Sequence, residues 1–147
     1  MISGRGCDNL DPYDLRRFVE AQARVFQQVV SELRAGRKMS HWIWFIFPQI
    51  HSLGTSPTSI KYAISSLDEA RAYLAHPTLG PRLYECTQLA LLVENRSASQ
   101  IFGSPDDMKF RSCMTLFDQA SPGDDIFRRA LQKYFRGVPD PMTLDRL

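Results

Sequence analysis

Helix-start signals recur along this chain, and they constrain the fold more than any other feature of the sequence. A Ser or Asp residue followed within three positions by proline or an acidic residue occurs at Asp11, Ser66, Ser104, Ser121 and Asp140. Such residues accept a hydrogen bond from a free amide of the first helical turn, and proline fits that turn without losing a bond. Because the segments that follow carry apolar residues near the 3.6-residue period, the pattern predicts an all-α protein.

The predicted elements are helices of unequal length. The periodicity indicates one long helix of about seven turns from Asp11 to its stop at Gly36, and then helices over 66–74, 79–95, 104–117 and 121–137, with a final turn from Asp140. The chain has 147 residues, of which 44% are hydrophobic, which suits a single core. We therefore expect a compact single-domain bundle of five to six main helices over residues 11–147, preceded by a flexible N-terminus at residues 1–10.

The charged residues and cysteines exclude several classes of function. Eighteen basic residues are scattered among 16 acidic ones, so the net charge of +2 does not indicate a nucleic-acid partner. Three widely spaced cysteines suit neither a disulfide framework nor a metal site, and no segment resembles a signal peptide or a membrane span. We expect a cytoplasmic protein without membrane association or cofactor, and, without a coiled-coil seam, a monomer.

The segment from Ser40 to Tyr62 breaks the helical regularity and is the predicted site of function. It contains six consecutive large apolar residues, Trp42 to Phe47, which are compatible with a buried strand or with a buried helical turn. Pro48 ends either structure. The polar stretch that follows is rich in Gly, Pro, Ser and Thr, and we expect a surface loop that forms the rim of a pocket walled by the aromatic run.

Two clusters supply the candidate functional residues. The wall and rim of the predicted pocket would come from the aromatic segment and its loop, while a helix farther along the chain would supply cationic and hydroxyl groups for an anion. The predicted ligand-binding residues are His41, Trp42, Trp44, Gln49, Gly54, Ser56, Tyr62, Lys109, Arg111 and Ser112. His41, Asp106 and Lys109 are the catalytic candidates, although a histidine in an apolar setting is more often structural.

Three functions are compatible with these residues. The first is a pocket for a small polar or nucleotide-like anionic ligand. The second is a protein–protein interaction module that uses the aromatic segment, because Trp and Tyr are typical interface anchors. The third is a hydrolase acting on phosphoribosyl or ADP-ribosyl compounds, with His41 or Asp106 as the base. The sequence contains no GxGxxG, Walker or GxSxG motif, and the histidine spacing does not match a zinc site.

Two strings in the sequence also resemble a known family. HWIWFIFPQ at 41–49 and KFRSCMTLF at 109–117 are similar to motifs of a small bacterial family of unknown function whose members are often labelled calpastatin. The resemblance extends over nearly all of residues 11–147 and implies an all-α, single-domain, monomeric fold without an assigned activity. Calpastatin itself is a disordered protein, whereas this chain has the aromatic content and periodicity of a packed core, so the label carries no functional information.

Overall fold

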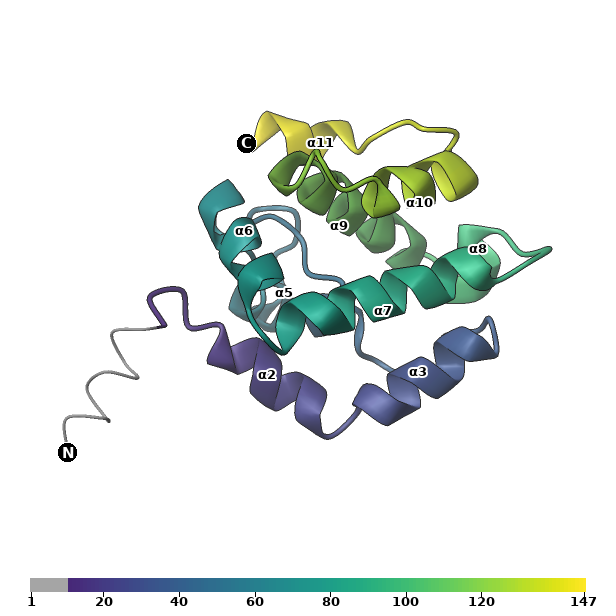
Figure 1. Ribbon diagram of the computed structural model, residues 1–147, viewed down its shortest axis with the longest axis horizontal. Helices are drawn as coiled ribbons and strands as arrows, with labels where there is room; N and C mark the ends of the chain where they lie inside the picture. Colours follow the sequence, from purple (N-terminus) through teal and green to yellow (C-terminus); the bar gives the residue numbers. More distant parts are fainter. Residues whose placement is uncertain (1–10) are drawn as a thin grey trace.

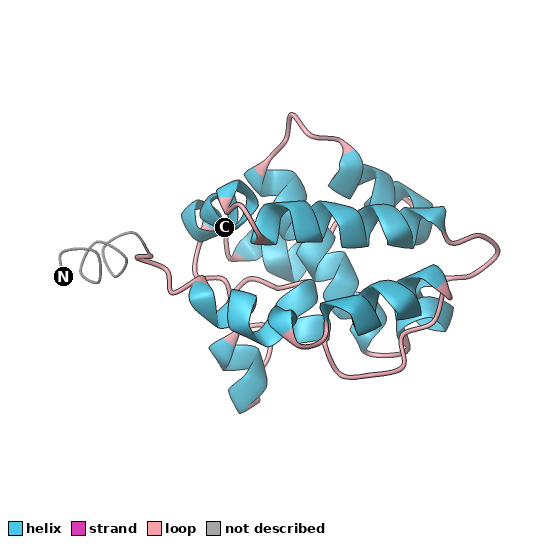
Figure 2. Ribbon diagram, turned by 60° about the horizontal axis from the view of Figure 1, so that its bottom comes forward, coloured by secondary structure: helices cyan, strands magenta, loops and turns pink. Residues whose placement is uncertain are grey.

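The structure, a computed structural model, describes residues 11–147, which form ten helices and no β-strand (Figures 1 and 2). The helices are α2 (Arg16–Ala23), α3 (Phe26–Arg34), α4 (Ile43–Ile46), α5 (Pro57–Lys61), α6 (Leu67–Ala75), α7 (Leu79–Leu92), α8 (Ala98–Phe102), α9 (Asp106–Ala120), α10 (Ile126–Phe135) and α11 (Pro141–Asp145). Six of these have eight residues or more, which confirms the predicted bundle of five to six main helices. The flexible N-terminus predicted for residues 1–10 lies outside the described residues.

Helix α9 forms the centre of the core. It packs against α4, α6, α8, α10 and α11, and Phe110, Cys113 and Phe117 on it are fully buried. Figure 1 shows α9, α10 and α11 on one side of the molecule and α2 and α3 on the other, with α7 between them. Because α7 contacts both α3 and α10, one continuous core joins the two sides.

The first predicted helix is wrong in its length, because the chain breaks at Arg24 and Val25 into α2 and α3. The two halves bury their apolar faces against different neighbours: α2 packs on α4, and α3 packs on α7. A straight helix could not reach both partners. The predicted end is well placed, since Gly36 follows α3 with a φ of 74°. The predicted start at Asp11 is too early, because α2 begins at Arg16, although the Asp11 carboxylate accepts a hydrogen bond of 2.7 Å from the Leu15 amide.

The helix start predicted at Ser66 is confirmed, but only half of the capping box that its SxxE pattern suggests is formed. The Ser66 hydroxyl accepts a hydrogen bond of 3.1 Å from the Glu69 amide and so caps α6. The Glu69 carboxylate does not return to Ser66, because it accepts hydrogen bonds from the Ser65 amide and from the Arg17 guanidinium, both at 2.9 Å. A long-range ion pair thus replaces the local bond that the sequence pattern predicts.

The remaining start signals differ in accuracy. Asp140 caps α11 as predicted, whereas Ser104 and Ser121 do not cap α9 and α10, which begin later, at Asp106 and Ile126. Two five-residue helices were missed, and each has a serine cap: Ser56 begins α5 and Ser97 begins α8. Both serines lie in polar segments between the predicted helices. No helix within residues 11–147 is long and apolar enough to cross a bilayer.

A buried carboxylate at the end of α3 fixes the start of the aromatic segment. Glu32 is 4% exposed and accepts hydrogen bonds from the Met39 and Ser40 amides (2.7 and 3.0 Å), the Ser40 hydroxyl (2.6 Å), Trp42 Nε1 (2.9 Å) and Gln28 (2.8 Å). Burial raises the pKa of Glu32, but the hydrogen bonds outweigh it and lower the pKa to about 2. The carboxylate therefore stays ionised and holds α3 to the chain that leads into α4.

We predict that Glu32→Gln lowers the free energy of unfolding at pH 7 by about 2–3 kcal/mol, because an amide cannot accept all five bonds and directs its own NH₂ at donors. The folded-state pKa lies below the ordinary value of 4.5, so the stabilisation is complete above pH 4.5 and is lost as the pH falls towards 2. Urea denaturation at several pH values measures the free energy of unfolding of the unaltered protein and of Glu32→Gln. The difference between the two values should become smaller below pH 4.5. The control is Glu20→Gln, which changes an exposed carboxylate on α2; an equal loss there would contradict the prediction.

Candidate functional site

The aromatic segment adopts a single helical turn, α4, which decides between the two conformations that its sequence allows. Trp42, Ile43, Ile46 and Phe47 are at most 2% exposed, whereas Trp44 is only half-buried. The Trp42 ring packs on Phe47 with its Nε1 held by Glu32, so this indole belongs to the core. Trp44 is the tryptophan of this segment that reaches the surface.

After α4, residues 50–64 leave the helical core and return to it beside the point where they left, and we call this segment the excursion. Ile50 and Ile64 form an isolated parallel bridge, in which the His51 amide donates to the Ile64 carbonyl and the Ile64 amide donates to the Gln49 carbonyl, both at 2.8 Å. Between these residues lies α5, so the predicted surface loop is wrong in lacking a helix. The two backbone bonds close the excursion at its base.

Two arginines hold the excursion against the helical core. From α2, the Arg17 guanidinium donates to the Lys61 carbonyl (2.8 Å) and the Ala63 carbonyl (2.9 Å), besides its bond to Glu69. From the end of α11, Arg146 donates to the Ser52 carbonyl at 3.3 Å. Arg17 thus fixes the backbone on both sides of Tyr62, and with it the position of that ring.

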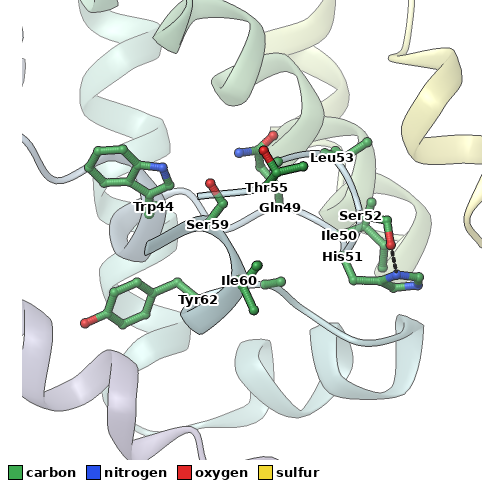
Figure 3. A pocket seen from close by; sticks show the side chains of 12 residues that line it. Trp44, Gln49, Ile50, His51, Ser52, Leu53, Thr55, Ser59, Ile60 and Tyr62 are labelled. Carbon is green, nitrogen blue, oxygen red and sulfur yellow. Dashed lines mark hydrogen bonds between the residues drawn. The ribbon is translucent and has the colours of Figure 1, made fainter. Parts of the chain in front are cut away.

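The excursion and α4 enclose a cavity of about 490 Å³, which we call the aromatic cavity (Figure 3). This volume lies within the range of small-molecule sites. The lining residues all come from one stretch of chain: Trp44, Gln49, Ile50, His51, Ser52, Leu53, Gly54, Thr55, Ser59, Ile60, Tyr62 and Ala63. None of them is acidic, and the hydroxyl and amide groups among them offer hydrogen bonds to a bound molecule.

Four of the predicted ligand-binding residues line the aromatic cavity: Trp44, Gln49, Gly54 and Tyr62. Ser56 lies just outside the lining, and its hydroxyl is 2.6 Å from that of Ser59, which borders the cavity. The predicted rim is therefore assembled from the segment in which the sequence placed it.

Lys109 also lies next to this cavity, although it does not line it. Its Nζ is 5.0 Å from the centroid of the Trp44 ring and 3.2 Å from a carboxylate oxygen of Asp106. The other Asp106 oxygen is 2.8 Å from Nζ of Lys38, whose side chain is 6% exposed and lies over the Trp42 ring. Two lysines thus share one carboxylate beside the aromatic segment, which leaves an excess of positive charge there.

Four predicted residues lie away from the cavity lining. His41 is exposed ahead of α4, and Trp42 is buried as described above. Arg111 donates to the carbonyls of Val138 and Pro139, both at 3.0 Å, so it connects α9 to the chain before α11.

Ser112 is the fourth of these residues, and it also has a structural role. Its hydroxyl is bonded to the Met108 carbonyl (3.0 Å) and to the Asp140 carboxylate (2.9 Å). Asp140 in turn caps α11, so the polar groups that the sequence shows on α9 serve the attachment of the C-terminal helix.

Sequence reasoning missed several lining residues, among them His51, Thr55, Ser59 and Ile60. Ser56 and Pro57 carried a usable signal, because this pair starts α5 just as Asp140 and Pro141 start α11. The close packing of Gly54 against Ser59 depends on the return path of the chain and has no local signal.

The buried cysteines of the core are unreactive, and the described residues contain no metal-ligand cluster. Burial raises the pKa of the Cys86 thiol to about 12 and that of Cys113 well above its usual value, so neither is a reactive thiolate. Within residues 11–147, no three His, Cys, Asp or Glu side chains are grouped so that they could hold a metal ion.

Comparison with known proteins places this geometry in a family. The family model described as "Protein of unknown function (DUF1810)" matches residues 12–147. The chain belongs to this family. The conserved hypothetical protein Rv1873 from Mycobacterium tuberculosis, known from a crystal structure, is 55% identical to this chain in sequence. The two structures match with a TM-score of 0.92 over 93% of this chain and 98% of that one. Among curated proteins, none matches. These matches confirm the predicted family of unknown function and the all-α fold.

Gly54 offers a test of how tightly the excursion is packed. A Cβ atom at this position would lie 2.7 Å from the Ser59 hydroxyl oxygen and 2.8 Å from its Cβ. We predict that Gly54→Ala displaces the chain at Gly54 from α5 and changes the NMR amide shifts of residues 51–60, while the melting temperature falls by only a few degrees, because the core does not include this contact.

Gly123→Ala is the matched control, because nothing lies within 4 Å of a Cβ added there. In the double variant Gly54→Ala with Ser59→Gly, which removes both obstructing atoms, we expect the excursion shifts to return towards those of the Ser59→Gly single variant. Unchanged shifts in Gly54→Ala would show that the close contact is not formed in solution.

Proposed function

We propose that the protein binds a small nucleotide-like anionic ligand in the aromatic cavity. One observation carries this proposal: the cavity has no acidic lining residue, and each of its two surface aromatic rings has a lysine beside it. Nζ of Lys109 is 5.0 Å from the Trp44 ring centroid, and Nζ of Lys61 is 5.3 Å from that of Tyr62. An anion at this rim would meet positive charge from both sides.

The lining supports a ligand with a planar ring. Trp44 and Tyr62 present aromatic faces, which favour offset stacking or edge contacts with another ring. Gln49, Thr55 and Ser59 add an amide and two hydroxyl groups, which can both donate and accept hydrogen bonds with ring nitrogens or sugar hydroxyls. An apolar wall with a few convergent polar groups is typical of small-molecule sites.

The burial of the aromatic segment favours this proposal over an interaction module. With Trp42, Ile43, Ile46 and Phe47 at most 2% exposed, the segment presents little aromatic surface to a partner protein. The hydrolase alternative is an enzymatic form of the same pocket, but its predicted bases, His41 and Asp106, do not line the cavity. We therefore propose binding and assign no reaction.

We also propose that the protein works as a cytoplasmic monomer without a nucleic-acid partner. The two cysteines of the described chain are free and buried, which suits a reducing compartment. The net charge of +2 gives no broad basic surface for a polyanion.

A thermal-shift screen against nucleotides, ADP-ribose, sugar phosphates and carboxylates tests the proposed function. We predict a higher melting temperature with at least one nucleotide-like anion, because a ligand at one hundred times its dissociation constant stabilises the fold by about 2.7 kcal/mol. Trp44→Leu should abolish the shift and Lys109→Gln should reduce it, since the first removes the ring and the second removes the charge beside it.

Arg37→Gln serves as the control for a lost positive charge, because Arg37 is exposed after α3 and is not a lining residue. Its shift should equal that of the unaltered protein. A screen in which no nucleotide-like anion raises the melting temperature would contradict the proposed function, as would a shift that persists unchanged in folded Trp44→Leu.

A further inference from the structure

A second concavity adjoins the aromatic cavity and shares one residue with it. It has a volume of about 840 Å³ and runs along α2, and we call it the α2 groove. Lys61 and Tyr62 form its border with the excursion, and Tyr62 also lines the aromatic cavity. Tyr62 therefore borders both concavities.

The position of the Tyr62 ring is fixed by aromatic neighbours and by hydrogen bonds to the adjacent backbone. Its centroid is 5.7 Å from that of Phe18 on α2 and 5.4 Å from that of Phe45 on α4. Arg17 holds the carbonyls of the residues on both sides of it. Figure 3 shows the ring at the edge of the aromatic cavity, with its hydroxyl directed away from the other labelled side chains.

The charges of the α2 groove are mixed but favour an anion at one place. Its acidic members are Asp14 and Glu20, and Glu20 is paired with Arg16 at 3.6 Å. Arg17 is engaged by Glu69 at 2.9 Å. Arg24 and Lys61 form no ion pair with any residue of the range 11–147, so they are the cations that this groove offers to a ligand.

These observations extend the proposed function, on which the following inference rests. We infer that the ligand has two parts: a ring that occupies the aromatic cavity, and a phosphate-bearing arm that passes Tyr62 and ends in the α2 groove at Lys61 and Arg24. Guanidinium and ammonium groups are the usual protein partners of phosphate oxygens. Tyr62 would separate the two parts and contact both.

The inference is tested by NMR titration of the complete protein with adenosine and with ADP, which differ only in the phosphate arm. Adenosine should shift amides of the aromatic cavity, such as those of Thr55 and Ser59. ADP should shift these and also the amides of Ala23 and Arg24, and it should bind about tenfold more tightly than adenosine.

The double variant Lys61→Gln with Arg24→Gln distinguishes the arm from the ring. It should lose the roughly tenfold advantage of ADP over adenosine, whereas Arg37→Gln should retain that advantage. The variant removes exposed side-chain charges only, so we expect it to remain folded.

Two other results would overturn the inference in different ways. If ADP shifts only the amides of the aromatic cavity, or if the double variant still binds ADP about tenfold more tightly than adenosine, the arm does not lie in the α2 groove. The proposed function is unaffected by that result. If neither compound shifts the cavity amides, the proposed nucleotide-like ligand is wrong, and the inference about its arm fails with it.

Discussion

A carboxylate buried at the end of α3 determines where the aromatic cavity forms. Glu32 accepts hydrogen bonds from the connection between α3 and α4 and from the indole of Trp42, so the chain enters α4 in one orientation. Trp42 then faces the core, and Trp44, two residues later, lies near the surface. A charged group removed from water is stabilising only when its hydrogen-bonding capacity is satisfied, and here four of its five bonds also order the chain that leads into the site.

Arg17 has the corresponding role on the other side of the cavity. Its planar guanidinium has five donors, and three of its hydrogen bonds join α2 to the backbone that precedes and follows Tyr62 and to the Glu69 carboxylate. The short helix α5 has no buried residue of its own, so its position depends on such connections and on the bridge at its base. Two buried or half-buried charges from the N-terminal half of the chain thus position both aromatic rings of the site.

The fold was largely predictable because helix starts and apolar periodicity are local properties. Ser66 and Asp140 cap helices at the positions that the start signals predict. The break between α2 and α3 was not predictable, because the periodicity continues across it and only the packing of each half on a different partner decides it. Glu69 shows the same limit, since its distant partner Arg17 replaces the local bond of a capping box.

The location of the aromatic cavity was predictable, but its full set of lining residues was not. The unusual composition of residues 40–62 indicated the segment that forms the cavity, and Trp44, Gln49, Gly54 and Tyr62 line it. Trp42 could not be separated from Trp44 by sequence, because the difference arises from the hydrogen bond to Glu32. Arg111 and Ser112 looked like ligand-binding groups because their actual partners, Val138, Pro139 and Asp140, lie more than 25 residues along the chain.

The bridge between Ile50 and Ile64 has a consequence for how such a site can change over time. The excursion leaves the helical core and re-enters it at neighbouring points, so its length is not coupled to the spacing of the helices. The entropic cost of closing a longer loop grows only slowly with its length. Insertions, deletions and replacements between these two isoleucines can therefore reshape the cavity while the core packing stays the same, and the bundle can serve as a constant frame for sites of different specificity.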